Sequence, residues 1–117
     1  MLQLNGQQLT LQQIVDVAAG REEVALAAEA RARVERARQV VHDIVTQGRT
    51  VYGVNTGFGK LSDVSIDRSD LMQLQLNLVR SHSVGLGEPL PIAEARAMLL
   101  LRSNVLAAGF SGAFWST

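Results

Sequence analysis

The side chains best suited to chemistry are Tyr52, the lone tyrosine, and His82, which ends a helix-patterned segment. A phenol can exchange a proton, but with an ordinary pKa near about 10 it is a poor base without help. Each side chain also has a structural interpretation: a core tyrosine with a satisfied hydroxyl, and a helix-terminal histidine that bonds a carbonyl group. Spacing alone favours these structural roles.

Tyr52 stands at the entrance of a stretch rich in glycine and polar side chains. Its members are Gly53, Asn55, Thr56, Gly57 and Gly59. Glycine is used where the backbone needs positive φ or a close approach. The stretch is therefore either a flexible connection or a shaped loop that carries function, and the tyrosine makes the second interpretation worth testing.

A phosphate-binding loop is the first alternative for this stretch. That motif needs four residues between its glycines and then Lys followed by Ser or Thr. Here Gly53 and Gly59 are separated by five residues, and Leu61 follows Lys60. The spacing therefore disfavours a nucleotide site.

Metal and serine-based chemistry are also poorly supported. The two histidines, His42 and His82, are far apart and lack an HExxH pattern or a carboxylate cluster. His42 is expected on a helix surface without a chemical role, and no metal is expected. A triad of Ser81, His82 and an aspartate is disfavoured because adjacent helical residues point about 100° apart.

Composition excludes several classes of partner. The 117 residues suffice for one domain, and 47% of them are hydrophobic, as in ordinary globular proteins. The 11 basic and 11 acidic side chains cancel, so neither nucleic acid nor an anionic membrane is expected as a partner. The absence of cysteine fits a cytoplasmic location. No signal peptide and no apolar run of about 20 residues is visible.

Hydrophobic periodicity predicts a mainly α fold with a short β element near Tyr52. The predicted elements are an extended lead-in over 1–9, helices over 10–20, 22–47, 67–81 (or from 65) and 91–108, and a strand over 50–54. Thr10 and Gln13 have capping-box spacing. The first helix is expected to bury the face of Leu11, Ile14, Val15 and Ala18.

At these motifs the chain resembles the aromatic amino acid ammonia-lyase and aminomutase family, and within it the histidine ammonia-lyases. The resemblance rests on three ordered blocks: YGVNTGFGKLSDVSI at 52–66, QLQLNLVRSHSVGLGEPLP at 73–91 and RSNVLAAGFSG at 102–112. It extends over nearly the whole chain. The fold implied is the N-terminal helical part of an ammonia-lyase over 1–112, followed by an atypical tail over 113–117.

The resemblance implies roles for particular residues. Tyr52 would take part in proton transfer, and the loop over 53–59 would close the pocket. His82 would contact the substrate side chain, and Ser81-His82 looks like the histidine-specific version of this pair. Asn77 and Leu78 match residues of the same wall. The substrate implied is L-histidine, converted to urocanate and ammonia by a cytoplasmic homotetramer.

The chain departs from the family in one important respect. The family uses an electrophilic methylidene-imidazolone group that forms from an internal Ala-Ser-Gly tripeptide, and the 117 residues contain no such tripeptide. The sequence is therefore expected to be a truncated lyase that is inactive alone. Two other functions stay open: a non-catalytic helical module that self-associates through the apolar segments 67–81 and 91–108, and a nucleotide-binding module, which a thermal shift with ATP would reveal.

Overall fold

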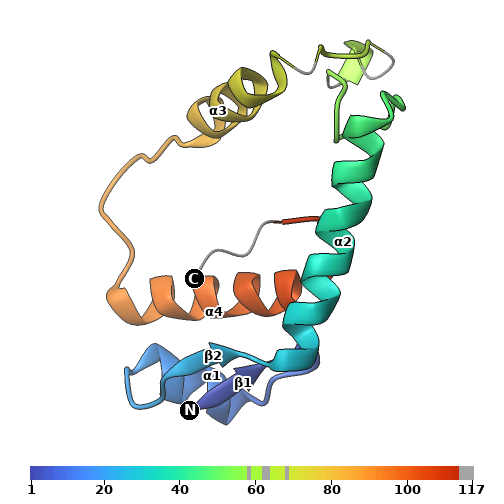
Figure 1. Cartoon of the computed structure of the whole chain (residues 1–117). Coiled ribbons are helices and arrows are strands. Elements are labelled where there is room, and N and C mark those ends of the chain that lie inside the picture. The colour runs from blue at the N-terminus through green and yellow to red at the C-terminus, as the bar shows by residue number, and fades with distance from the viewer. Residues whose placement is uncertain (58, 62–63, 68, 114–117) are drawn as a thin grey trace. The chain divides into compact units, whose positions relative to one another are not determined.

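The computed structural model describes residues 1–57, 59–61, 64–67 and 69–113 (Figure 1). Of the predicted loop, Phe58 lies outside the described residues, and of the predicted tail only Ala113 lies within them. The elements are β1 (Leu2–Leu4), α1 (Leu11–Ala18), β2 (Val24–Leu26), α2 (Ala28–Thr46), the 3-10 helix η1 (Gly59–Leu61), α3 (Leu71–His82) and α4 (Ile92–Ala107). The expected mainly helical fold is confirmed.

The described residues form two compact units, whose boundary falls within α2. Unit 1 comprises residues 1–40 and the described residues from 89 onward, and unit 2 comprises residues 41–88.

Unit 1 is built on a parallel pair of short strands joined through α1 (Figure 1). Leu2 pairs with Val24, and Leu4 pairs with Leu26. Parallel strands need a crossover connection, and α1 supplies it. The predicted extended lead-in is thus correct as far as β1 is concerned.

The N-terminus of α1 is capped as its sequence predicts. The Thr10 N–H donates to Gln13 Oε1 at 2.8 Å, and the Gln13 N–H donates to Thr10 Oγ1 at 3.2 Å. The predicted buried face is only partly right, because Leu11 is 83% exposed while Val17 is buried. The core of unit 1 contains Leu4, Val17, Ala27, Ala30, Leu100 and Ala107.

The prediction of a helix from residue 22 is wrong at its start. Residues 24–26 form β2, and α2 begins at Ala28. Pairing with β1 satisfies backbone hydrogen-bonding groups of this segment. The Leu2 N–H donates to the Glu23 carbonyl at 2.7 Å, and the Ala27 N–H donates to the Leu4 carbonyl at 3.0 Å. Tertiary pairing therefore overrides the helix propensity of this alanine-rich segment.

Gly6 and Gln7, in the loop that follows β1, pack directly on the C-terminal end of α4. Asn104 on α4 accepts the Gly6 N–H at 3.0 Å and donates to the Gln7 carbonyl at 2.6 Å. Gly6 has φ +76°, and a Cβ added there would lie 2.5 Å from the Ala108 Cα. Only glycine fits this approach without moving one backbone or the other.

The replacement Gly6→Ala tests that contact. We expect it to lower the free energy of unfolding by about 3 kcal/mol, because positive-φ strain and overpacking each cost roughly 1–3 kcal/mol. Gly48→Ala is the matched control, since Gly48 has φ +65° with nothing within 4 Å of an added Cβ. Urea denaturation of both variants measures the difference, and equal losses would show that the backbone approach does not matter.

In unit 2 the predicted strand over 50–54 is wrong. The Val54 and Asn55 N–H groups donate to the Val51 carbonyl at 3.0 and 3.3 Å, which bends the backbone into a turn. The β structure of this region is instead an isolated antiparallel bridge between Thr56 and Ser65. Local side-chain bonds from Asn55 compete with strand pairing here.

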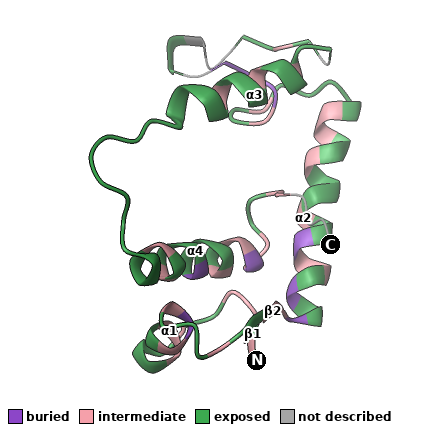
Figure 2. Cartoon of the chain, turned by 90° about the vertical axis from the view of Figure 1, so that its left-hand side faces the viewer, coloured by how far each residue is buried: buried purple, intermediate pink, exposed green. Residues whose placement is uncertain are grey.

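The helix α3 begins later than predicted, at Leu71, and neither Ser65 nor Asp67 caps it. Ser65 is occupied by the bridge, and the Asp67 carbonyl accepts the Asp70 N–H at 2.9 Å in a turn before the helix. No residue of α3 is buried within the described part of the chain (Figure 2).

Across the described residues, no helix is both long enough and apolar enough to cross a membrane.

Candidate active site

The candidate site residues of unit 2 fall into two local clusters, the loop after Tyr52 and the last turns of α3. The loop is organised by Asn55, which is 4% exposed. Its Oδ1 accepts the Val51 N–H at 2.9 Å, its Nδ2 donates to the Arg49 carbonyl at 2.8 Å, and its carbonyl accepts the Ile66 N–H at 2.9 Å. Asn55 thereby ties both ends of the loop together.

Thr56 and the glycines complete this loop. Thr56 is 1% exposed and donates from Oγ1 to the Gly57 carbonyl at 2.9 Å, while the Gly57 N–H donates to the Val64 carbonyl at 3.2 Å. Gly53 and Gly59 have positive φ, at 76° and 59°, with open space where a Cβ would be. The described part of the stretch is thus a shaped loop, in which Gly53 and Gly59 serve the backbone conformation.

Tyr52 lies in the turn at the entrance of this loop and is 63% exposed. The interpretation as a core tyrosine is therefore wrong for the described residues. The phenol therefore lies at the surface, on a turn whose backbone is held by the buried Asn55.

His82 and its neighbours form the second cluster, at the C-terminal end of α3. The ring atom Nδ1 of His82 lies 2.8 Å from the Leu78 carbonyl oxygen and 3.1 Å from Ser81 Oγ. Ser81 Oγ itself donates to the Leu78 carbonyl at 2.9 Å. The structural role expected for His82, a bond to a helix carbonyl, is confirmed, and the ring is also exposed.

This contact corrects the argument that adjacent Ser81 and His82 must point apart. Both side chains turn back to the same carbonyl, one helical turn earlier, and so meet each other. Asn77 belongs to a separate interaction, because its Oδ1 accepts Gln73 Nε2 at 2.8 Å. Leu78 is half-buried and contributes its carbonyl to the cluster.

His42, on α2, is exposed as predicted. The described residues contain no group of three or more His, Cys, Asp or Glu side chains arranged to hold a metal ion.

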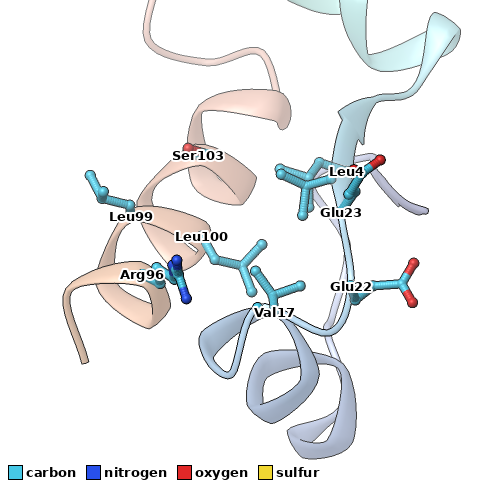
Figure 3. A pocket seen from close by; sticks show the side chains of 10 residues that line it. Leu4, Val17, Glu22, Glu23, Arg96, Leu99, Leu100 and Ser103 are labelled. Atoms are coloured by element: carbon cyan, nitrogen blue, oxygen red, sulfur yellow. The ribbon is translucent and has the colours of Figure 1, made fainter. Parts of the chain in front are cut away.

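Unit 1 contains a cavity of about 540 Å³ that the sequence patterns did not predict (Figure 3). Arg96 lies on its α4 wall, Glu22 and Glu23 lie on the segment that leads into β2, and apolar core side chains lie between them. Arg96 is one of two arginines on α4, the other being Arg102. Arg96 Nη1 would be 2.9 Å from a Cβ at Gly20, so the guanidinium lies at the C-terminal end of α1.

A structural role for Arg96 follows from that position, because a cation near a helix C-terminus is stabilised by the helix dipole. Across the cavity Glu22 pairs with the N-terminal ammonium group of Met1. The clearest electrostatic perturbation in unit 1 lies elsewhere: hydrogen bonds from Gln12 and then Arg21 lower the pKa of Asp16. Unit 1 therefore supports the fold, and the candidate chemistry lies in unit 2.

Comparison with known proteins defines the family of the chain. The family model described as aromatic amino acid lyase matches residues 9–117, so the chain belongs to the aromatic amino acid lyase family. The histidine ammonia-lyase of Anaeromyxobacter dehalogenans (strain 2CP-C) is 55% identical over 111 residues, which cover 95% of this chain and 22% of the relative. The resemblance noted in the sequence is thereby confirmed.

Solved structures agree on the fold. The histidine ammonia-lyase from Trypanosoma cruzi matches with a TM-score of 0.86 and 43% identity, covering 95% of this chain and 22% of that one. The tyrosine aminomutase from Streptomyces globisporus matches with a TM-score of 0.87 and 38% identity, covering 96% and 21%. The chain spans about a fifth of the length of these relatives.

Proposed function

We propose that the chain is the N-terminal part of a histidine ammonia-lyase, which converts L-histidine to urocanate and ammonia. The observation that carries this proposal is the 55% identity to a histidine ammonia-lyase over 95% of the chain. The exposed imidazole of His82, whose hydrogen bonds among the described residues are made through Nδ1, supports it, since the opposite ring nitrogen faces away from those bonds. A substrate ring that must form a hydrogen bond binds more favourably next to such a group.

Roles follow for the two clusters. Tyr52 transfers a proton to or from the substrate, and the loop over 53–59 closes over it. His82 contacts the imidazole of L-histidine, and Asn77, Leu78 and Ser81 belong to the same wall. As in the family, we propose a cytoplasmic homotetramer whose subunits share the active sites.

The prosthetic group of the family does not come from these residues. Methylidene-imidazolone forms from Ala-Ser-Gly, and none of the 117 residues form that tripeptide. No catalytic step can therefore be assigned to the group here, and the chain's own residues provide binding and proton transfer only.

The 117-residue chain is accordingly expected to lack ammonia-lyase activity. Incubation of the purified chain with L-histidine should give no increase in urocanate absorbance, because the electrophile is missing. The full-length Anaeromyxobacter dehalogenans relative at equal concentration is the positive control. Measurable turnover by the pure chain would refute this expectation.

A chimera tests the proposed function itself. In it, the matching segment of the Anaeromyxobacter dehalogenans relative is replaced by residues 1–112 of this chain. We expect the chimera to release urocanate from L-histidine and to leave L-phenylalanine unchanged. A folded chimera that prefers L-phenylalanine or L-tyrosine would overturn the assignment.

The exposed apolar surface of α4 favours a second function, a non-catalytic module that self-associates. Ile92, Met98, Leu99, Leu101 and Val105 are 45–70% exposed, and most of α4 is exposed in the structure (Figure 2). A helix that is apolar all round is normally buried. We expect light scattering to show an oligomer of the 117-residue chain that Met98→Glu weakens and the control Glu94→Gln preserves, and a clean monomer would exclude this function.

A further inference from the structure

The last turn of α3 gathers polar side chains on its own carbonyl groups. The Leu78 carbonyl oxygen accepts from Ser81 Oγ at 2.9 Å and lies 2.8 Å from His82 Nδ1. The Ser83 hydroxyl makes a similar bond to the Val79 carbonyl at 2.7 Å. His82 thus has one ring nitrogen engaged by its own helix.

That contact decides where the imidazole proton lies. A carbonyl oxygen only accepts, so a nitrogen 2.8 Å from it must carry the hydrogen. Ser81 has already given its own hydrogen to Leu78, and its oxygen lone pair therefore faces Nδ1 at 3.1 Å. Both neighbours of Nδ1 are acceptors, and an unprotonated Nδ1 would face two lone pairs.

We propose that the Leu78 carbonyl and Ser81 hold the neutral His82 ring as its Nδ1–H tautomer, so that Nε2 is presented as a hydrogen-bond acceptor. In this arrangement Ser81 is a positioning residue that acts through His82. The bond made by one ring nitrogen commonly sets the state of the other in this way. Unconstrained imidazole favours the opposite tautomer, with its hydrogen on Nε2.

The tautomer sets what kind of ring this position accepts, an extension that rests on the proposed function. An Nε2 acceptor pairs with a ligand ring that donates a hydrogen, as the N–H of a neutral imidazole does. A phenyl ring has no such donor and would leave Nε2 unpaired, which a site built around a hydrogen bond penalises strongly. The predicted ligand class is therefore an amino acid whose ring carries an N–H or O–H donor.

Nitrogen NMR of the 15N-labelled 117-residue chain tests the tautomer directly, at an alkaline pH where ordinary imidazoles are neutral. We expect the His82 correlations to show mainly Nδ1–H. His42 is the internal reference, because its exposed ring makes no hydrogen bond among the described residues, and we expect it to show mainly Nε2–H. Equal tautomer populations in the two rings would overturn the proposal.

Three substitutions separate the role of Ser81 from a general effect on the helix. Ser81→Ala should lower the Nδ1–H population of His82, and Ser81→Thr, which keeps the hydroxyl, should restore it. Ser83→Ala deletes an equivalent bond that does not reach His82, and it should leave the tautomer unchanged. A Ser81→Ala chain whose His82 matches the parent would remove Ser81 from the proposal.

The same substitution has a kinetic readout in the chimera. Ser81→Ala should raise KM for L-histidine by roughly three- to tenfold, the equivalent of one hydrogen bond, with a smaller change in kcat. The NMR measurement needs neither ligand nor activity, so an inactive chimera would count against the proposed function while leaving the tautomer result intact. An unchanged KM alongside a shifted tautomer would overturn the extension to ligand recognition.

Discussion

Tyr52→Phe in the chimera is expected to lower kcat for L-histidine by about 10²- to 10⁴-fold, the usual contribution of a positioned general acid or base. The substitution removes one hydroxyl and keeps the ring. Because Tyr52 is 63% exposed, the change should leave the stability of the protein nearly unaltered. Urocanate release under saturating substrate measures kcat, and urea denaturation checks the fold.

A neighbouring hydroxyl provides the control for that result. Thr50→Val also deletes an exposed hydroxyl, at the start of the same loop, and it should change kcat by no more than about twofold. If Tyr52→Phe and Thr50→Val have equal effects, the phenol has no special part in proton transfer. A large loss of stability in Tyr52→Phe would instead assign the residue a structural role.

The placement of Tyr52 depends on a residue whose role could be only partly predicted from the sequence. The sequence places Asn55 in a glycine-rich stretch that is either a flexible connection or a shaped loop that carries function. Its burial and its bonds to Arg49, Val51 and Ile66 emerged only from the structure. Composition shows that a loop is polar and rich in glycine, but it does not show which amide points inward. The same asparagine explains why residues 50–54 turn back and do not form the predicted strand.

Local signals were reliable where the interaction itself is local. The capping box of Thr10 and Gln13 spans four residues, and the structure shows both of its bonds. The sequence does not predict β2, because its partner, β1, lies about 20 residues earlier and residues 24–26 are equally compatible with the start of a helix. The late start of α3 has a similar cause, since the bridge between Thr56 and Ser65 occupies the candidate cap.

The same distinction applies to the end of α3. The motif Ser81-His82 is recognisable in the sequence as a unit, and there its specificity for histidine rests on resemblance alone. The shared Leu78 carbonyl engages the Nδ1 edge of the ring, and this contact supports the proposal that Nε2, on the opposite edge, is presented to a ligand. The angle of about 100° between adjacent helical residues does not predict this contact, because the rotamers of Ser81 and His82 turn both side chains back to the same carbonyl.

His82→Leu in the chimera is the second large expected effect. The substitution removes the acceptor for the substrate imidazole, and we expect kcat/KM for L-histidine to fall by roughly 10- to 100-fold, the cost of leaving a buried polar group unpaired. The value for L-phenylalanine should rise, because an apolar side chain no longer penalises a ring without a donor. Steady-state kinetics with both amino acids should therefore show the preference shifting by about 10² or more.

His42→Leu is the matched control for this prediction. His42 is also an exposed helical histidine of unit 2, on α2. Its replacement by leucine should leave the preference between the two amino acids unchanged. Equal changes in His42→Leu and His82→Leu would show that any lost imidazole has this effect, and the assignment of His82 would fail. A loss confined to His82→Leu, with L-phenylalanine turnover gained, would tie specificity to the ring that Leu78 and Ser81 hold in place.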